Sequence, residues 1–358
     1  MKKTNSLLTA ILLASLAITS CKKSDAPIPV NNNADLKKIK DFFDANKPKP
    51  ESFTLNAAAG GTITLASGTK ITFPANAFKN ASGVVSGNVN VSALDILKPS
   101  SMILGDKPTV TADGKMLESF GEIIVKAEQN GNPLQLNRDA AGKGVNVAMA
   151  VGAGAGQQRG ELPIWSGDTT ITQTTSGYNH ENILTTISSQ VTVKKGVEWN
   201  QMPAFGSANA TTSFFNLDSL GTWRNVDVLY SDPRPKTTVL GYFGNLFNSA
   251  TGTNYMGQEP SMLFFKTAGT NTLVKLYNVI FNPVAGKEGL LSYQNMMPIG
   301  QVGTFLAIST KNGKFYAEMR DVTIAAPNAG NTYTGYTFNL SEVSEAQLLN
   351  LINQMNTK

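Results

Sequence analysis

The strongest constraint on the fold is a series of short runs in which apolar and polar residues alternate, interrupted by turns rich in Gly, Asn and Pro. Residues 62–65 and 69–73 show this alternation on either side of Ser67-Gly68. A period of two is typical of a strand with one buried face, and two such runs around a short turn indicate a β-hairpin. The pattern therefore predicts an all-β protein. Further alternating runs lie at 87–93 and 122–127, and further strand-like runs lie at 189–193, 261–265, 272–278, 303–310 and 314–322.

The chain is long enough for two folded domains, because it has 358 residues of which 41% are hydrophobic. We expect two β-sandwich domains, at residues 51–150 and 189–358. A Gly-Ala run at 151–156 and a stretch rich in Thr and Ser at 168–189 favour a linker or irregular segment at 151–188.

Charge argues against a nucleic-acid partner for the folded part. The formal net charge is +5, but Lys2 and Lys3 lie in the leader and residues 22–50 carry seven lysines against four aspartates. Residues 51–358 therefore hold 21 basic and 21 acidic residues. A neutral body lacks the basic surface with which proteins hold phosphates.

The first 21 residues have the pattern of a secretory leader that ends at a cysteine. Lys2 and Lys3 precede an apolar stretch at 7–18, which is too short to span a bilayer. The following Ile-Thr-Ser-Cys sequence at 18–21 resembles the lipobox of bacterial lipoproteins, which implies cleavage before Cys21 and lipidation of its thiol. Cys21 is the chain's only cysteine, so an internal disulfide is excluded. The alternative is an ordinary signal peptide at 1–20.

Residues 21–50 are expected to form a flexible tether, because Lys, Asn and Pro dominate them. Leu36, Ile39, Phe42 and Phe43 have helical spacing and predict one or two turns that dock on the body or on the membrane surface. The Lys-Lys-Ser-Asp sequence after Cys21 resembles surface-exported lipoproteins of Bacteroidota. We therefore expect a lipid-anchored protein of the outer membrane, with the membrane as one partner.

The first domain, at residues 53–145, resembles a ZU5-like domain. The likeness rests on four motifs: GGT at 60–62, GTKITFPANAF at 68–78, GNVNV at 87–91 and LESFGEIIV at 117–125. ZU5 domains are β-sandwich interaction modules, so the resemblance implies binding. Some relatives cleave themselves at a His-Phe-Ser motif, but the single histidine, His180, is followed by Glu181 and Asn182. The rest of the chain resembles uncharacterised lipoproteins.

The second domain is expected to end in a helix. Ser341 is a candidate N-cap, and an apolar stripe follows at helical spacing. Asn312-Gly313 is suited to a type I′ turn between two strands. The stripe comprises Leu348, Leu349, Leu351, Ile352 and Met355.

The sequence predicts no catalytic, metal or cofactor site. With Cys21 lipidated, His180 is the only remaining Cys or His ligand and the only histidine base. One such residue is too few for a zinc site, and the sequence around it does not indicate a nucleophilic triad. Carboxylate pairs could hydrolyse glycosides without a histidine. The pairs on offer are Glu118 with Glu122 and Asp218 with Asp227.

Three tryptophans are candidates for stacking on a sugar. Trp165 and Trp223 follow apolar runs, whereas Trp199 lies between Glu198 and Asn200 and is expected to be the most exposed. The possible ligand contacts are Trp199 and Trp223. The leading hypothesis is a non-catalytic, membrane-anchored binding or scaffold module for a protein of the envelope. The alternatives are a surface glycan-binding accessory protein and a carboxylate-based glycoside hydrolase.

Overall fold

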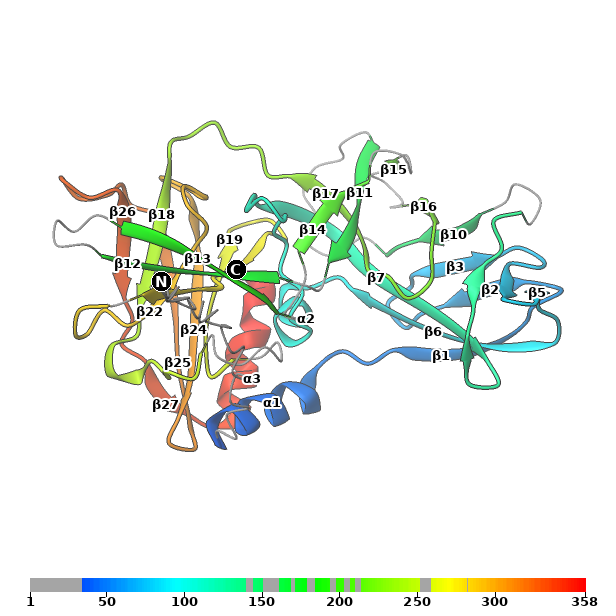
Figure 1. Ribbon diagram of the computed structural model, residues 1–358, viewed down its shortest axis with the longest axis horizontal. Helices are drawn as coiled ribbons and strands as arrows, with labels where there is room; N and C mark the ends of the chain where they lie inside the picture. Colours follow the sequence, from blue (N-terminus) through cyan, green and yellow to red (C-terminus); the bar gives the residue numbers. More distant parts are fainter. Residues whose placement is uncertain are drawn as a thin grey trace, which may run out of the picture. The chain divides into compact units, whose positions relative to one another are not determined.

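The computed structural model describes residues 34–139, 144–150, 161–168, 171–178, 184–193, 198–202, 207–209, 214–251, 259–281 and 283–358. The predicted signal peptide, Cys21 and His180 lie outside these ranges. The expected all-β fold with a C-terminal helix is confirmed: antiparallel sheets dominate the chain, and α3 (Glu345–Gln354) closes it (Figure 1).

The largest sheet folds back on itself around the first core. Its order in the described ranges is β1-β6-β7-β17-β11-β15-β16-β10-β3-β2, with β14 and β8 beside β11 and β7. Leu162 and Pro163 of β11 pair with β15, whereas Ile164, Trp165 and Ser166 pair with β17. Strand β11 therefore joins the half of the sheet that runs from β1 to β17 to the half that runs from β15 to β2. The core between them takes side chains from β2, β3, β6, β7, β10 and β16. The strands are β1 (Glu51–Asn56), β2 (Gly61–Thr64), β3 (Lys70–Phe73), β6 (Asn88–Ile96), β7 (Leu117–Gln129), β8 (Asn132–Pro133), β10 (Val145–Ala148), β11 (Glu161–Asp168), β14 (Glu198–Gln201), β15 (Ser207–Asn209), β16 (Phe214–Leu217) and β17 (Arg224–Leu229).

A second sheet joins segments from the middle and the end of the chain. Its order is β13-β12-β21-β22-β18-β23, and β26 pairs in parallel with β18. The strands are β12 (Ile171–Tyr178), β13 (Leu184–Val193), β18 (Lys236–Tyr242), β21 (Asn278–Phe281), β22 (Gly289–Leu291), β23 (Met297–Pro298) and β26 (Tyr333–Thr337). The short strands β4 (Phe78–Asn80), β5 (Gly83–Val84) and β9 (Gln135–Leu136) form a separate small sheet.

A third sheet, β20-β19-β24-β25-β27, is covered on both faces. In β19, Leu263 and Phe265 face a core shared with β18 and β22, whereas Met262 and Phe264 face a core shared with the helices. Because both faces are buried, the run at 262–265 is continuously apolar and does not alternate. The strands are β19 (Ser261–Thr267), β20 (Leu273–Lys275), β24 (Val302–Lys311), β25 (Lys314–Thr323) and β27 (Ser341–Val343).

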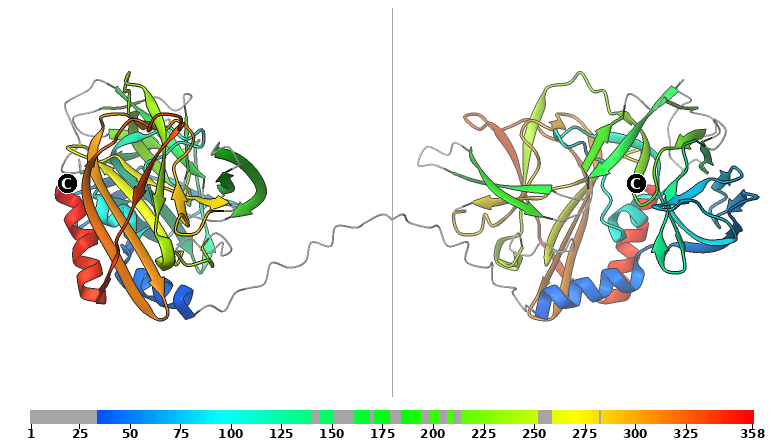
Figure 2. Two further views of the ribbon diagram at one scale, coloured as in Figure 1. Left: turned by 90° about the vertical axis from the view of Figure 1, so that its left-hand side faces the viewer. Right: turned by 45° about the vertical axis from the view of Figure 1, so that its right-hand side comes forward.

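Three helices, α1 (Ala34–Asn46), α2 (Pro99–Leu104) and α3, pack on the outer face of the third sheet (Figures 1 and 2). The N-cap of α3 is Ser344, not the predicted Ser341, because Ser344 forms a capping box with Gln347 while Ser341 begins β27. The predicted turn at Asn312-Gly313 has positive φ at both residues, as a type I′ turn requires. Short 3-10 helices lie at Gly244–Leu246 and Met355–Thr357.

Part of the predicted tether is a docked helix. α1 runs for 13 residues, and Ile39, Phe42 and Phe43 are buried against β24 and β25. Asp35 at its first turn accepts hydrogen bonds from the backbone N–H groups of Asn312 and Gly313, at 3.0 and 2.6 Å. The prediction that this apolar stripe forms helical turns docked on the body is confirmed, and the helix is longer than the one or two turns expected. The flexible-tether prediction fails for residues 34–46, because the stripe packs on a tertiary partner.

The strand pairing differs from the predicted domain boundaries. Residues 151–188, predicted as a linker, include β11 and β12, and β11 lies inside the first sheet. Strands β14 to β17, which the sequence prediction places in the second domain, also complete the first sheet. Polar, Thr-rich strands look like linkers in the sequence, because the partners that pair with them lie far away in the chain.

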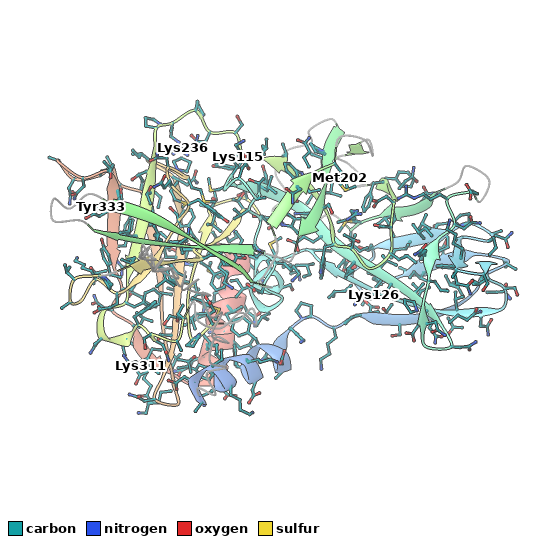
Figure 3. All side chains as sticks on the ribbon, in the orientation of Figure 1. Lys115, Lys126, Met202, Lys236, Lys311 and Tyr333 are labelled. Atoms are coloured by element: carbon teal, nitrogen blue, oxygen red, sulfur yellow. The ribbon has the colours of Figure 1, made fainter. Side chains whose placement is uncertain are left out.

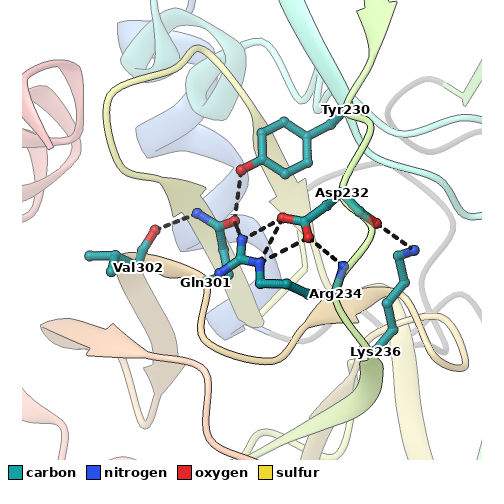
Figure 4. Close-up of polar contacts among 6 residues, drawn as sticks. All are labelled: Tyr230, Asp232, Arg234, Lys236, Gln301 and Val302. Carbon is teal, nitrogen blue, oxygen red and sulfur yellow. Dashed lines mark hydrogen bonds and ion pairs between the residues drawn. The ribbon is translucent and has the colours of Figure 1, made fainter.

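A cluster of polar side chains forms hydrogen bonds around the connection from β17 to β18, where the chain leaves the first sheet (Figure 4). Tyr230 Oη and Arg234 Nη2 both donate to Gln301 Oε1, at 2.7 Å each. Arg234 Nε donates to both oxygens of Asp232, at 2.9 and 3.0 Å, and these bonds lower the pKa of that carboxyl. The connection is therefore held by side chains as well as by strand pairing.

Candidate functional site

The candidate site is a groove on the outer face of β6 and β7, which we call the β6–β7 groove. It consists of two hollows with volumes of about 480 and 260 Å³, and both are lined by Ser92 and Lys126. The larger hollow is closed by Pro133, Leu134, Leu220 and Gly221, and the smaller one by Lys47, Pro48, Pro50, Gly105 and Trp223. Figure 3 labels Lys126 on β7.

Strand register builds the floor of this groove. Asn90 pairs with Glu128, Ser92 with Lys126, and Leu94 with Ile124. Directly opposed residues in an antiparallel pair point to the same face, and alternate residues share it. The intervening Val89, Val91, Val125 and Ala127 are in the first core, so the groove residues face outward.

The turn between β16 and β17 forms one wall and carries Trp223. Its shape is fixed by Arg224, whose guanidinium binds Asp218 in a bidentate pair at 2.6 and 2.7 Å. The same group donates to Ser166 Oγ, to Ser219 Oγ and to the carbonyl of Trp223. All five N–H donors of the guanidinium are thus used.

Beyond Ile124 the floor of the groove continues into a buried ionic cluster. Glu122, opposite Ile96, is fully buried, and neither of its carboxylate oxygens has a hydrogen-bond partner among the described residues. Burial, and secondarily the neighbouring Asp227, raise the pKa of Glu122 well above its usual value. Lys107 lies between this cluster and the groove, with its Nζ 5.2 Å from the centre of the Trp223 ring. Burial lowers the pKa of Lys107.

The rest of the cluster ties the first sheet to the third. Asp227 is fully buried, and burial raises its pKa well above the usual value although Asn225 Nδ2 donates a hydrogen bond to it. Asp106 forms a buried ion pair at 2.5 Å with Lys275 of β20. The buried charges are therefore placed at the junction of sheets and not in a cleft open to a substrate.

Of the two tryptophans predicted as ligand contacts, one lines the groove and the other is buried. Trp223 is half-buried and lines the β6–β7 groove, whereas Trp199, expected to be exposed, has 0% exposure. Trp199 Nε1 donates to the Pro108 carbonyl at 3.0 Å, and its ring packs with Leu117 and Trp165. The prediction for Trp199 is wrong, because its indole is enclosed by Leu117 and Trp165 while residues 110–112 pair with the backbone of Trp199 along the edge of β14.

The predicted carboxylate pairs are also not arranged for hydrolysis. Glu118 and Glu122 are both buried, and Asp218 is bound to Arg224 while Asp227 lies in the buried cluster. Among the side chains described here, no group of three or more His, Cys, Asp or Glu could hold a metal ion. In the same part of the chain, no helix is long and apolar enough to cross a membrane.

Comparison with family models, curated proteins and solved structures found no match to this chain. The ZU5-like resemblance and the lipoprotein assignment therefore remain predictions from the sequence.

Sequence reasoning did not find most of the β6–β7 groove. The alternation in 122–127 places Glu122, Ile124 and Lys126 on one face of a strand, but it does not say whether that face is open. The neighbouring strand and the walls come from residues 47–50, 90–96 and 220–223, and only tertiary structure brings these together.

Proposed function

We propose that this protein is a lipid-anchored envelope protein that acts as a non-catalytic binding module, and that its β6–β7 groove holds an extended segment of a partner protein. The groove itself is the observation that carries the proposal. Attachment through Cys21 to the outer membrane is part of it and rests on the leader sequence.

The length of the groove favours an extended polypeptide over a compact small ligand. Its floor follows β6 from Asn90 to Ile96, and six residue steps at roughly 3.3 Å each span about 20 Å. A polypeptide in extended conformation has the same rise per residue as the strand beneath it. Such a segment would cover the floor with about as many residues as β6 itself provides.

The lining favours a segment with apolar side chains and a carboxylate. Leu134 and Leu220 offer apolar surface in one hollow, and Leu94, Ile124 and Trp223 in the other. A buried or half-buried aromatic beside a polar rim is typical of the residues that dominate binding energy. Lys47 and Lys126 outnumber Glu128 among the charged lining residues, so an acidic residue in the partner segment is favoured.

The site geometry does not favour the glycoside hydrolase alternative. Glu118, Glu122 and Asp227 are enclosed, and a pair of catalytic carboxylates must flank a bound sugar. No observation in the β6–β7 groove supplies such a pair.

The proposal is tested by site-specific photocrosslinking in cells that produce the full chain. A photoreactive residue replaces Lys126 in the groove, and the matched control replaces Lys236, which is also exposed but lies on β18 (Figure 3). We expect a discrete crosslinked protein from position 126 and none from position 236. The crosslinked segment is then made as a synthetic peptide, and its affinity for purified protein should fall by about tenfold or more on Trp223→Ala.

Two results would contradict the proposal. One is equal crosslinking from both positions. The other is a synthetic peptide whose affinity does not depend on Trp223. Membrane attachment is checked separately, because Cys21→Ser should release the protein from the membrane fraction without changing peptide affinity.

A further inference from the structure

Another hollow, which lies on β26 and is separate from the two hollows of the β6–β7 groove, has the lining of a sugar-binding site. It has a volume of about 390 Å³, which is within the range for small-ligand pockets of roughly 300–1,000 Å³. Three tyrosines, Tyr242, Tyr333 and Tyr336, line it together with Asn328 and Asn331. Figure 3 labels Tyr333 on β26, which pairs with β18.

The aromatic floor is built by a close approach of two strands. Tyr242 on β18 lies across Gly335 on β26, where an added Cβ would come within 2.7 Å of the ring. A side chain at position 335 would force this ring to shift. Tyr333, half-buried at the start of β26, packs against the cluster that contains Tyr242, Leu240 and Leu291.

The segment that leads into the turn with Asn328 and Asn331 is held to β26 by side-chain hydrogen bonds. Thr334 Oγ1 donates to the Ala325 carbonyl at 2.8 Å, and Tyr336 Oη accepts from the Ala325 N–H at 3.0 Å. The turn that carries Asn328 and Asn331 therefore starts from a fixed point on β26. A pocket with preformed walls loses less entropy when a ligand binds.

Two groups in the wall are available to a ligand. The side-chain amides of Asn328 and Asn331 make no hydrogen bond within the described part of the chain, and Asn328 is exposed while Asn331 is half-buried. Each amide offers two donors and an acceptor. Exposed Thr337, also in the lining, adds a hydroxyl that both donates and accepts.

The charges of the lining argue against phosphorylated ligands. Among the described residues that line this hollow, Lys287 is the only charged one, and its Nζ lies 4.3 Å from the centre of the Tyr242 ring. A nucleotide or a sugar phosphate normally needs several cations or a row of backbone N–H donors. This hollow offers amides, hydroxyls and tyrosine rings instead.

We propose that this hollow, which we call the β26 site, binds one or two sugar units of a glycan. A pyranose ring presents a face of C–H groups, which packs on an aromatic ring, and a rim of hydroxyls, which both donate and accept hydrogen bonds. Tyr333 would contact the C–H face, while Asn328, Asn331 and Thr337 would bind the rim. The proposal goes beyond the peptide groove, because the β26 site and the β6–β7 groove share no lining residue among those that the structure describes.

The test is isothermal titration calorimetry on the purified full chain in detergent. The probes are neutral hexose, N-acetylhexosamine and uronic acid oligosaccharides of two to six units. We expect at least one class to bind, and Tyr333→Ala to weaken its affinity about tenfold or more. Asn331→Ala removes a side-chain amide that makes no hydrogen bond among the described residues, and it should weaken the affinity by a smaller factor. Trp223→Ala is the matched aromatic control and should leave sugar affinity unchanged.

The proposal is overturned if none of the three classes binds. It is also overturned if the bound oligosaccharide keeps its affinity in both Tyr333→Ala and Asn331→Ala. An equal loss of sugar affinity in Trp223→Ala would indicate that the sugar binds in the β6–β7 groove. This result would count against the β26 site and would also contradict a peptide role for that groove. Failure of the peptide experiment alone leaves these outcomes unaffected.

Discussion

Removing the carboxylate of Asp218 should destabilise the protein far more than removing an equally well-formed ion pair at the surface. The side chains of Arg224 and Asp218 are 5% and 9% exposed, so both charges are taken out of water. In Asp218→Ala, the guanidinium keeps its bonds to Ser166, Ser219 and the Trp223 carbonyl but loses two N–H partners and its counterion.

The magnitude follows from the number of bonds lost. A hydrogen bond to a charged group contributes about 1.5–3 kcal/mol, and two are removed. Breaking a buried ion pair by removing one partner costs about 3–5 kcal/mol. We therefore expect the free energy of unfolding to fall by about 3–5 kcal/mol, with Arg224 left as a buried charge.

Urea unfolding followed by tryptophan fluorescence measures this change. The matched control is Glu342→Ala, which breaks the 2.8 Å Lys314–Glu342 pair whose side chains are both 54% exposed, and which should cost less than about 1 kcal/mol. The double variant Asp218→Ala with Arg224→Met removes the stranded charge, so it should be more stable than Asp218→Ala alone.

The reasoning would be refuted if Asp218→Ala cost no more than the surface control. It would also be refuted if Arg224→Met destabilised the Asp218→Ala protein as much as it destabilises the wild type. Either result would mean that the pair does not hold the turn that carries Trp223.

Two further predictions concern the ionic cluster and α1. Because burial raises the pKa of Glu122, the folded protein binds a proton that the unfolded chain has already released, so stability falls as pH rises above about 4.5. Glu122→Gln should therefore be more stable than wild type at pH 8, by about 1–3 kcal/mol, but not at pH 4, and a pH-independent difference in chemical unfolding would contradict this. Phe43→Ala should cost about 3–5 kcal/mol in urea unfolding and expose residues 34–50 to limited proteolysis, because Phe43 is fully buried. Lys37→Ala on the exposed side of α1 is the control, and equal proteolysis of both variants would show that α1 does not depend on this contact.

Local sequence patterns predicted the elements that depend on near neighbours. The alternation at 62–73 and 314–322, the Asn312-Gly313 turn and the apolar stripe at 348–355 all form as expected. Each of these depends on residues that are adjacent or one helical turn apart, so the information lies within a short window. The observed N-cap of α3 lies three residues after the predicted one, because Ser341 belongs to β27 and pairs with Ala317 of β25.

The sequence by itself determined that the chain forms strands with a C-terminal helix, and it supplied the leader, Cys21 and Trp223 as functional candidates. Tertiary structure decided which strands pair, and thereby where the polar faces open. Trp199 is buried because its ring packs on Leu117 and Trp165. Glu122 is buried with Asp227 and Lys107 as its charged neighbours, whereas Lys126 on the same face is exposed. A strand fixes only the alternation of its faces, and segments far away in the chain determine which face is covered.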